Sequence, residues 1–147
     1  YDVTLCDPRP SYLDNWNVDG VEKTSRLPDD VVRERFSNPY SGIIALAHDP
    51  RVDDMALMEA LKTNAFYIGA MGSARTSAAR RERLPELGLS ELEINRLHAP
   101  IGFQIDSKTP AEIAISVMAE VTAGCVQTKA SAICMMEIPA SFAMTSS

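Results

Sequence analysis

Residues 65–76 carry the strongest structural signal in the chain, and they read Ala65-Phe66-Tyr67-Ile68-Gly69-Ala70-Met71-Gly72-Ser73-Ala74-Arg75-Thr76. The first four are apolar without alternation, which is typical of a strand covered on both faces by helices. Two glycines then bracket a turn that ends at Ser73, and a segment of helical composition runs from Ala74 to Leu84. Strand, glycine turn and helix in this order predict one unit of a parallel α/β sheet.

The segments before this unit repeat the alternation of strand and helix. Strands are predicted over Tyr1–Cys6 and Gly42–His48, with a short edge strand over Gly20–Thr24 between them. The run Gly42–His48 is apolar without alternation, so we expect it to be a central strand. Residues Asp7 to Pro10 are expected to form a loop, because two prolines interrupt any strand there.

Proline, serine and aspartate mark the expected helix starts. One helix begins at Pro28, and another begins at a cap formed by Asp53 or Asp54. The segment Ser90–Leu97 opens with the spacing of a capping box, and so does Thr109–Gly124. Helices that separate predicted strands in this way favour a Rossmann-like sheet with right-handed crossovers.

The end of the chain is harder to interpret. Residues 98–102 are expected to form a loop, and the Rossmann-like domain is assigned to residues 1–126. The tail, residues 127–147, contains Pro139 and a Ser/Thr-rich end, and its middle is compatible with either strand or helix. We leave its structure open.

Composition and charge exclude several classes of protein. The chain has 147 residues, of which 46% are hydrophobic and 23% charged, and its formal net charge is −6. This balance argues against a nucleic-acid or anionic-lipid surface, so any anion site must be local. No apolar run is long enough to cross a bilayer, and three cysteines without a CxxC pair suit a reducing compartment. We expect a soluble, cytoplasmic protein with buried thiols, and a chain that opens inside structure as a fragment or processed product.

The carboxyl ends of the predicted strands hold the candidate site residues, because ligands of open parallel sheets bind beyond those ends. The turn from Gly69 to Ser73 joins a strand to a helix that carries Arg75, so free backbone N–H groups, a hydroxyl and a guanidinium could converge on one anion. The alternative is that the glycines only let the helix pack closely on the sheet. Further along the helix, three arginines are interpreted as a solvated face: Arg80, Arg81 and Arg83.

Other constellations are weaker. Asp7 follows a strand as a ribose-binding acid does, but no G-x-G-x-x-G turn occurs in the chain, so NAD(P) is an unfavoured ligand. His48-Asp49 could be a base or proton relay, and we favour a strand end followed by an Asp49-Pro50 turn. His98 is expected to stand in a rigid loop and to bond a carbonyl. No spacing suggests a metal site or a nucleophile.

Several motifs together resemble the C-terminal Rossmann domain of the XdhC/CoxI family, over Asp2 to Ala123 and in the family's order. The quoted block from Phe66 to Thr76 makes the resemblance specific. The other motifs that carry it are Asp7-Pro8-Arg9-Pro10, His48-Asp49-Pro50, Gly88-Leu89-Ser90, His98-Ala99-Pro100-Ile101-Gly102 and Thr109-Pro110-Ala111-Glu112-Ile113-Ala114.

The resemblance implies a fold and two departures from the family pattern. Complete members are similar to a two-part protein whose N-terminal domain, first Rossmann strand and glycine turn precede the position of Tyr1. The expected fold is therefore an α/β, parallel-sheet Rossmann-like domain that lacks the first strand and glycine-rich turn. Where the family usually has an arginine pair after Gly-Ser, this chain has Ala74-Arg75.

The resemblance also implies a function. Family members look like accessory factors that handle the molybdenum cofactor, a phosphate-bearing pterin dithiolene, and support its sulfuration and insertion into xanthine dehydrogenase-type hydroxylases. We expect a maturation factor rather than an enzyme. The alternatives are an NAD(P)-dependent oxidoreductase fragment and a structural half-domain without a ligand.

The expected site and partners follow from this interpretation. Catalytic residues and metal ligands are not expected. A target hydroxylase and a cysteine desulfurase are the expected partners, and a homo-oligomer is expected because the first strand would have an unpaired edge. The cofactor-binding residues are expected to be Asp7, Arg9, Gly69, Ala70, Met71, Gly72, Ser73, Arg75 and Thr76, with a candidate second wall of His48, Asp49 and His98.

Overall fold

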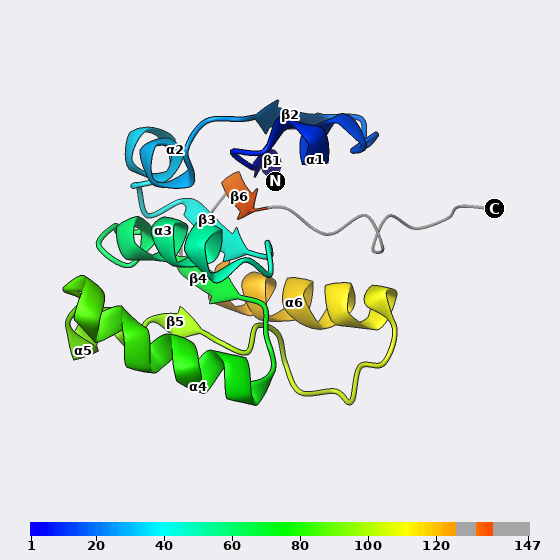
Figure 1. The fold of residues 1–147 in the computed structure, drawn as a ribbon. Helices are drawn as coiled ribbons and strands as arrows, with labels where there is room; N and C mark the ends of the chain where they lie inside the picture. Colours follow the sequence, from blue (N-terminus) through cyan, green and yellow to red (C-terminus); the bar gives the residue numbers. More distant parts are fainter. Residues whose placement is uncertain (126–131, 137–147) are drawn as a thin grey trace.

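A computed structural model describes residues 1–125 and 132–136 of the chain. Six strands form one fully parallel sheet in the order β2-β1-β6-β3-β4-β5 (Figure 1). The predicted parallel, Rossmann-like α/β fold is confirmed. The strands are β1 (Asp2–Cys6), β2 (Val21–Thr24), β3 (Ser41–Ala45), β4 (Tyr67–Ala70), β5 (Leu97–His98) and β6 (Ala132–Met136).

Helices connect these strands, and proline opens most of them because a helix start needs no N–H at its first position. The described helices are α1 (Pro10–Asp14), α2 (Pro28–Arg35), α3 (Pro50–Ala60), α4 (Ala74–Arg83), the 3₁₀ segment η1 (Leu84–Leu87), α5 (Glu91–Ile94) and α6 (Pro110–Cys125).

The centre of the sheet is occupied by β6, in the segment whose structure the sequence left open. Its Cys134 stands beside Thr4 of β1 on one side and Ile43 of β3 on the other. In the common Rossmann order 3-2-1-4-5-6, this central position belongs to the first strand. Here the last described strand fills it. The expected unpaired edge on β1 is therefore wrong, because β1 pairs with both β2 and β6.

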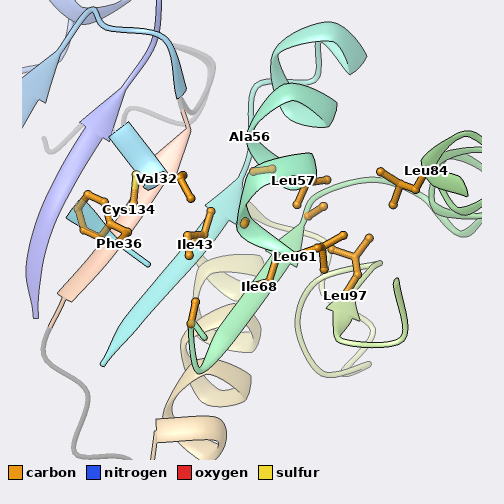
Figure 2. Packing of buried hydrophobic residues seen from close by; sticks show 14 of the residues in the cluster. Val32, Phe36, Ile43, Ala56, Leu57, Leu61, Ile68, Leu84, Leu97 and Cys134 are labelled. Carbon is orange, nitrogen blue, oxygen red and sulfur yellow. The ribbon is translucent and has the colours of Figure 1, made fainter. Parts of the chain in front are cut away.

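Helices cover both faces of the sheet. On one face, side chains of α2 and α3 such as Val32 and Leu57 pack against Ile43, Ile68 and Cys134 (Figure 2). On the other face, Val117 and Val121 of α6 pack against the neighbouring strand residues Ile44, Tyr67 and Ile133. Adjacent strand residues point to opposite faces, so apolar runs without alternation are what this arrangement requires.

Several boundaries differ from those predicted. The strand expected to end at His48 ends at Ala45, and α3 begins at Pro50 because the Asp49 side chain caps it, accepting a hydrogen bond from Arg51 N. Asp53 and Asp54 are therefore not the cap. Pro10 begins α1 instead of a loop, since its missing N–H is harmless in a first turn.

Two further boundaries affect the candidate site. Gly69 and Ala70 lie inside β4 rather than in the following turn. Leu97 and His98 form β5, so the loop predicted to start at His98 begins one residue later. Both helix starts predicted from capping boxes are confirmed: the Ser90 hydroxyl accepts from Glu93 N, and the Thr109 hydroxyl accepts from Glu112 N.

Cys6 and Cys134 are free thiols buried in the core, as expected, whereas Cys125, which was also expected to be buried, is only half-buried. Burial raises the pKa of the Cys6 thiol to about 12. Neither buried thiol is therefore a reactive thiolate near neutral pH. Within residues 1–125 and 132–136, no helix is both long and apolar enough to cross a membrane.

Candidate functional site

A cleft of about 750 Å³ opens at the carboxyl edge of the sheet. One wall is the turn between β4 and α4, a second is the turn between β3 and α3, and the third is the segment that follows β5. This volume lies in the range of small-molecule sites. The lining residues are His48, Pro50, Met71, Gly72, Ser73, Thr76, Arg80, Pro100, Ile101, Gly102, Phe103, Gln104, Ile105, Asp106, Ser107, Ile113 and Ser116.

The turn between β4 and α4 is built to leave N–H donors free. The Ser73 hydroxyl caps α4 by accepting from Thr76 N at 3.1 Å, and the first turn of this helix holds no acidic residue. Within the described chain, the backbone N–H groups of Ala74 and Arg75 donate to no acceptor. Free N–H groups at the positive end of a helix are a ready anion site.

Gly72 is required by the shape of this turn. Its φ is +154°, and an added Cβ would lie 3.2 Å from Cβ of Thr76. The Ser77 hydroxyl, which is buried and has no hydrogen-bond partner among the described residues, would lie 3.7 Å from the same point. A positive φ favours glycine, so the backbone conformation of the turn itself selects glycine at position 72.

The interpretation of Arg80, Arg81 and Arg83 as a solvated face is wrong. Arg80 is only 2% exposed, and the Arg81 guanidinium donates to the carbonyl oxygens of Ile94 and Leu97. Arg83 forms an ion pair with Asp54 at 2.9 Å. Arg80 and Arg83 thus link α4 to α3, and Arg81 links α4 to the segment that contains α5 and β5.

Arg80 stands at the centre of a buried polar network that lines the cleft. Its NH2 group donates to Asp53 Oδ2 at 2.9 Å, its Nε–H to Asp54 Oδ1 at 3.3 Å, and its NH1 group to the carbonyl oxygen of Met71 at 3.2 Å. Asp53 also accepts from the backbone N–H of Ala47 at 3.1 Å. Burial raises the pKa of Asp53, while the Arg80 charge opposes that rise. The network therefore fastens the turn after β3 to the turn after β4.

His48 and Asp49 have different positions at the edge of the sheet. His48 lines the cleft, and its φ of 55° is unusual for a residue other than glycine. Asp49 caps α3 instead, and hydrogen bonds from the side chain and backbone of Arg51 lower the pKa of the Asp49 carboxyl. The favoured interpretation of Asp49-Pro50 as a turn becomes, in the structure, a helix cap with proline at the first position.

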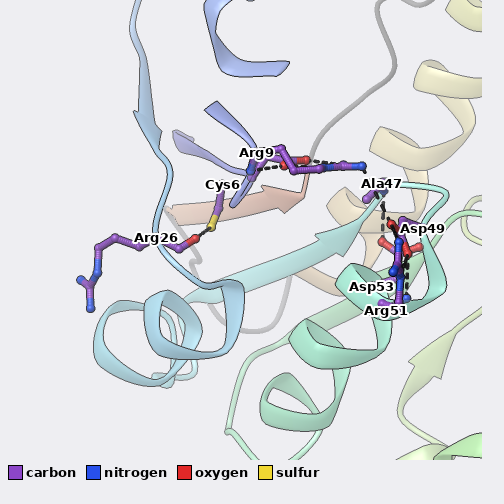
Figure 3. A network of polar contacts seen from close by, with 8 residues as sticks. Cys6, Arg9, Arg26, Ala47, Asp49, Arg51 and Asp53 are labelled. Carbon is purple, nitrogen blue, oxygen red and sulfur yellow. Dashed lines mark hydrogen bonds and ion pairs between the residues drawn. The ribbon is translucent and has the colours of Figure 1, made fainter. Parts of the chain in front are cut away.

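Asp7 and Arg9 lie together at the end of β1 and are not among the residues that line the cleft, and Figure 3 shows Arg9 extending from there toward Asp49. Asp7 is fully buried, and its two carboxylate oxygens accept from the Arg9 Nε–H and NH2 groups at 2.8 and 2.7 Å. Arg9 reaches toward the neighbouring turn, where its NH1 nitrogen is 4.0 Å from Asp49 Oδ2. Arg9 thus connects the ends of β1 and β3 across the sheet edge.

His98 belongs to a separate polar cluster. Its Nδ1 lies 3.0 Å from Glu120 Oε1, not from a carbonyl as expected, and its ring stacks on Tyr67 with centroids 4.6 Å apart. Burial alone would raise the pKa of Glu120, but hydrogen bonds from Tyr67, Gly102 and His98 outweigh it and lower that pKa. Because Gly102 N donates to Glu120 at 2.7 Å, this cluster positions the start of the cleft's third wall.

The predicted site residues thus separate into those that line the cleft and those that lie outside it. The cleft brings together Met71, Gly72, Ser73 and Thr76 with His48. Arg75 is exposed beside the cleft, and Gly69 serves a packing role, since an added Cβ there would meet Ile101 Cδ1 at 2.6 Å. Whether any of these residues binds a ligand stays a prediction.

Sequence reasoning missed the third wall and the buried arginine. Residues 98–102 were expected to form a loop, but residues 103–107 contain no motif, and their position depends on α6, whose Ser116 hydroxyl donates to the Phe103 carbonyl oxygen. The burial of Arg80 had a signal in the sequence. Asp53 and Asp54 lie in the preceding helix, where their apolar neighbours already predicted a packed face, and carboxylates on such a face need a cation as partner.

A parallel sheet covered by helices on both faces, with a cleft at its carboxyl edge, defines a Rossmann-like α/β domain. The family model described as the XdhC Rossmann domain matches residues 1–121, so the chain belongs to this family. The resemblance to XdhC/CoxI proteins is confirmed.

Similar proteins are longer than this chain. The molybdenum cofactor insertion chaperone PaoD of Escherichia coli K12 is 37% identical over 81 residues, which cover 55% of this chain and 26% of PaoD. A probable xanthine dehydrogenase subunit from Bacillus subtilis 168 is 25% identical over 123 residues, covering 82% of this chain and 35% of that protein. A crystal structure described as a xanthine dehydrogenase from Bacillus halodurans superposes with a TM-score of 0.70 and 26% identity, covering 88% of this chain and 38% of that one.

Proposed function

We propose that this chain holds the molybdenum cofactor as cargo and supports its insertion into a xanthine dehydrogenase-type hydroxylase. The observation that carries the proposal is the anion-ready turn, Gly72 to Thr76, inside a cleft of a chain that belongs to the XdhC Rossmann domain family. A relative named as a molybdenum cofactor insertion chaperone supports the same function. Because the chain spans 26% of that relative, the proposal concerns what this domain contributes.

The residues of the cleft suit the phosphate end of such a cargo. Uncapped N–H groups at the start of α4 and the Ser73 hydroxyl are donors for a phosphate, and the absence of a side chain at Gly72 lets the anion approach the backbone. A cleft of about 750 Å³ is large enough for a pterin-sized molecule.

The metal end of the cargo needs nothing from the cleft. Among the described residues, no group of three or more His, Cys, Asp or Glu could hold a metal ion. The cofactor brings the molybdenum together with its own dithiolene sulfur ligands. His48 and the segment 100–107 then have the task of enclosing the cargo rather than ligating metal.

The remaining predicted ligands keep a secondary place in the proposal. Asp7, Arg9, Asp49 and His98 lie outside the residues that line the cleft, so we assign them to positioning of its walls. We further propose that the chain supports sulfuration of the cofactor, with a cysteine desulfurase as sulfur donor and the hydroxylase as acceptor. A homo-oligomer stays a prediction, without the unpaired β1 edge as its basis.

The test is cofactor loading of this chain. The chain would be purified from a host that makes the molybdenum cofactor, and both molybdenum content and the fluorescence of the oxidised pterin would be measured. We expect both signals in the same fractions, and Gly72→Val should remove both. Wild-type protein with no more molybdenum or pterin than an unrelated Rossmann protein from the same host would refute the proposal.

The competing oxidoreductase function is tested by titration with NAD and NADP. Because Asp7 already accepts three hydrogen bonds from Arg9, one from the backbone N–H and two from the guanidinium, it has little capacity left for ribose hydroxyls. We expect dissociation constants no tighter than about millimolar, where binding free energies are only about −4 kcal/mol. Micromolar binding measured by calorimetry would revive the oxidoreductase function.

A further inference from the structure

The floor of the cleft contains a buried cation that the proposed anion site does not yet use. Arg80 lines the cleft although only 2% of it is exposed. A guanidinium has five N–H donors. Three bond to Asp53, Asp54 and the Met71 carbonyl oxygen, so two donors remain, one on each terminal nitrogen.

We propose that Arg80 is the principal side-chain ligand of a tetrahedral oxyanion bound at the start of α4. This inference rests on the proposed use of the cleft as an anion site, and it names the side chain that would recognise the anion. A phosphate monoester or pyrophosphate group is the class of ligand it would take, because such a group has several oxygens that can accept from the two remaining N–H donors of the guanidinium.

A second observation beside Arg80 also points to a ligand. The Ser77 hydroxyl is buried and has no hydrogen-bond partner among the described residues. It lies beneath Gly72, within 3.7 Å of the position that a Cβ would take. A buried, unpaired hydroxyl and two unused guanidinium donors next to one glycine turn are unusual in a packed interior, where polar groups normally find partners.

Arg80 is held in place by charges that balance. Asp53 and Asp54 face Arg80 from α3, and Arg83 adds a second ion pair to Asp54 at 2.9 Å. Two cations and two carboxylates leave the network neutral, so the anion would be recognised by oriented N–H donors and the α4 terminus more than by net charge. The carboxylates also fix the guanidinium, which lowers the cost of ordering it on binding.

This assignment differs from the sequence-based expectation, in which Arg75 supplies the guanidinium of the anion site. Arg75 is exposed, does not line the cleft and has no side-chain partner among the described residues. An exposed, unfixed guanidinium contributes little to binding, because it must be ordered and it is screened by solvent. We expect Arg75 to assist the approach of an anion and Arg80 to hold it.

The experiment is a calorimetric titration of inorganic pyrophosphate into the wild-type chain and three variants. Arg80→Lys keeps the charge and removes the fork, so affinity should fall about tenfold or more. Arg83→Lys is the matched control, because it perturbs the same Asp54 from the same helix without lining the cleft, and its affinity should change less than about twofold. Arg75→Ala should also change affinity by less than about threefold.

A measurement without substitution covers the case in which Arg80→Lys does not fold. The Nε–H NMR signals of the arginine guanidinium groups would be followed while pyrophosphate is added to wild-type protein. The Arg80 signal should shift and saturate, while those of Arg81 and Arg83 should stay nearly fixed. No shift at Arg80, or unchanged affinity in folded Arg80→Lys, overturns the assignment.

The two proposals can fail separately. Pyrophosphate binding through Arg80 in a chain that never carries molybdenum or pterin would refute the cargo and support the oxyanion site. Cofactor loading that Arg80→Lys leaves intact would support the cargo and refute Arg80 as its principal side-chain ligand.

Discussion

Two helices begin at the same edge of the sheet, and their N-termini are prepared for different purposes. The start of α3 carries its own anion, since Asp49 caps it and Asp53 stands in its first turn. The start of α4 is capped by the neutral Ser73 and has no acidic residue in its first turn. Both helix ends attract negative charge, but only α4 leaves that attraction unsatisfied by the protein.

This difference between the two helix starts indicates where on the carboxyl edge of the sheet an anion could bind. A helix start with its own carboxylate is electrostatically complete and would repel an added anion. A helix start with a hydroxyl cap retains free N–H donors for one. The ion pair between Asp53 and Arg80 connects the N-terminus of α3 to α4, so the first turn of α3 also helps to hold the anion-ready start of α4 in place.

The largest effect should come from breaking that connection. Asp53→Ala leaves Arg80 without its closest carboxylate in a buried site, and loss of one partner of a buried ion pair typically costs about 3–5 kcal/mol. The free energy of unfolding from denaturant titration measures this cost. Asp30→Ala, which removes an exposed ion pair with Arg33, should cost less than about 1 kcal/mol, and an equal loss in both variants would contradict the role given to Asp53.

A smaller loss of stability, together with a specific loss of anion binding, is expected when Gly72, just before the start of α4, is replaced. Gly72→Val places a β-branched side chain at a φ of +154° and against Thr76, so stability should fall by about 1–3 kcal/mol and pyrophosphate binding at least tenfold. Gly88→Val is the control, because Gly88 also has a positive φ, of +87°, but has open space around it. Melting curves and calorimetry on both variants should show similar strain and a binding loss in Gly72→Val alone.

Exchanging the caps should alter binding with little change in stability. Ser73→Asp gives α4 the cap of α3, and the two residues are similarly good caps, so unfolding should change by no more than about 0.5 kcal/mol. The new carboxylate should repel an incoming anion and weaken pyrophosphate binding about tenfold. If calorimetry finds binding unchanged, the anion does not lie at the start of α4.

The smallest effect concerns how the stability of the protein depends on acid pH through Asp49, the cap of α3. Hydrogen bonds from Arg51 lower the pKa of Asp49, so its stabilising contribution is present at neutral pH and is lost as pH falls through that lowered value. Asp49→Ser should therefore be slightly less stable than wild type near neutral pH, and the two should converge below about pH 4. Thermal melts across this range test the sign, which would be wrong if the difference grew on acidification.

Much of the fold could be predicted because its signals are local. The apolar run of Ala65–Ile68 and the capping boxes at Ser90 and Thr109 depend on residues a few positions apart. The boundaries of β3 and α3 were less accessible, because Asp49, Asp53 and Asp54 all follow an apolar run and any of them could cap. Tertiary contacts decide among them: Asp53 and Asp54 are used by Arg80.

The candidate site could be predicted only in part for the same reason. The glycine turn was visible in the sequence, and it does line the cleft. The pairing of Arg80 with Asp53 spans 27 positions, and the contact of Ser116 with Phe103 depends on where α6 lies on the sheet. An arginine in a helix looks exposed until its neighbours in space are known.

The position of β6 has a consequence for how the protein is made. Strands β2 and β1 form one part of the sheet, strands β3, β4 and β5 form another, and among the described strands β6 is the one that pairs with both parts. Asp2 pairs with Ala132, so the ribosome must synthesise nearly the whole described chain before the first strand finds its inner neighbour. Until β6 is made, β1 and β3 lack the neighbour that they have in the finished sheet, and unpaired strand edges are prone to mispairing and aggregation. Of the strands that the structure describes, the central one is therefore the last to be synthesised.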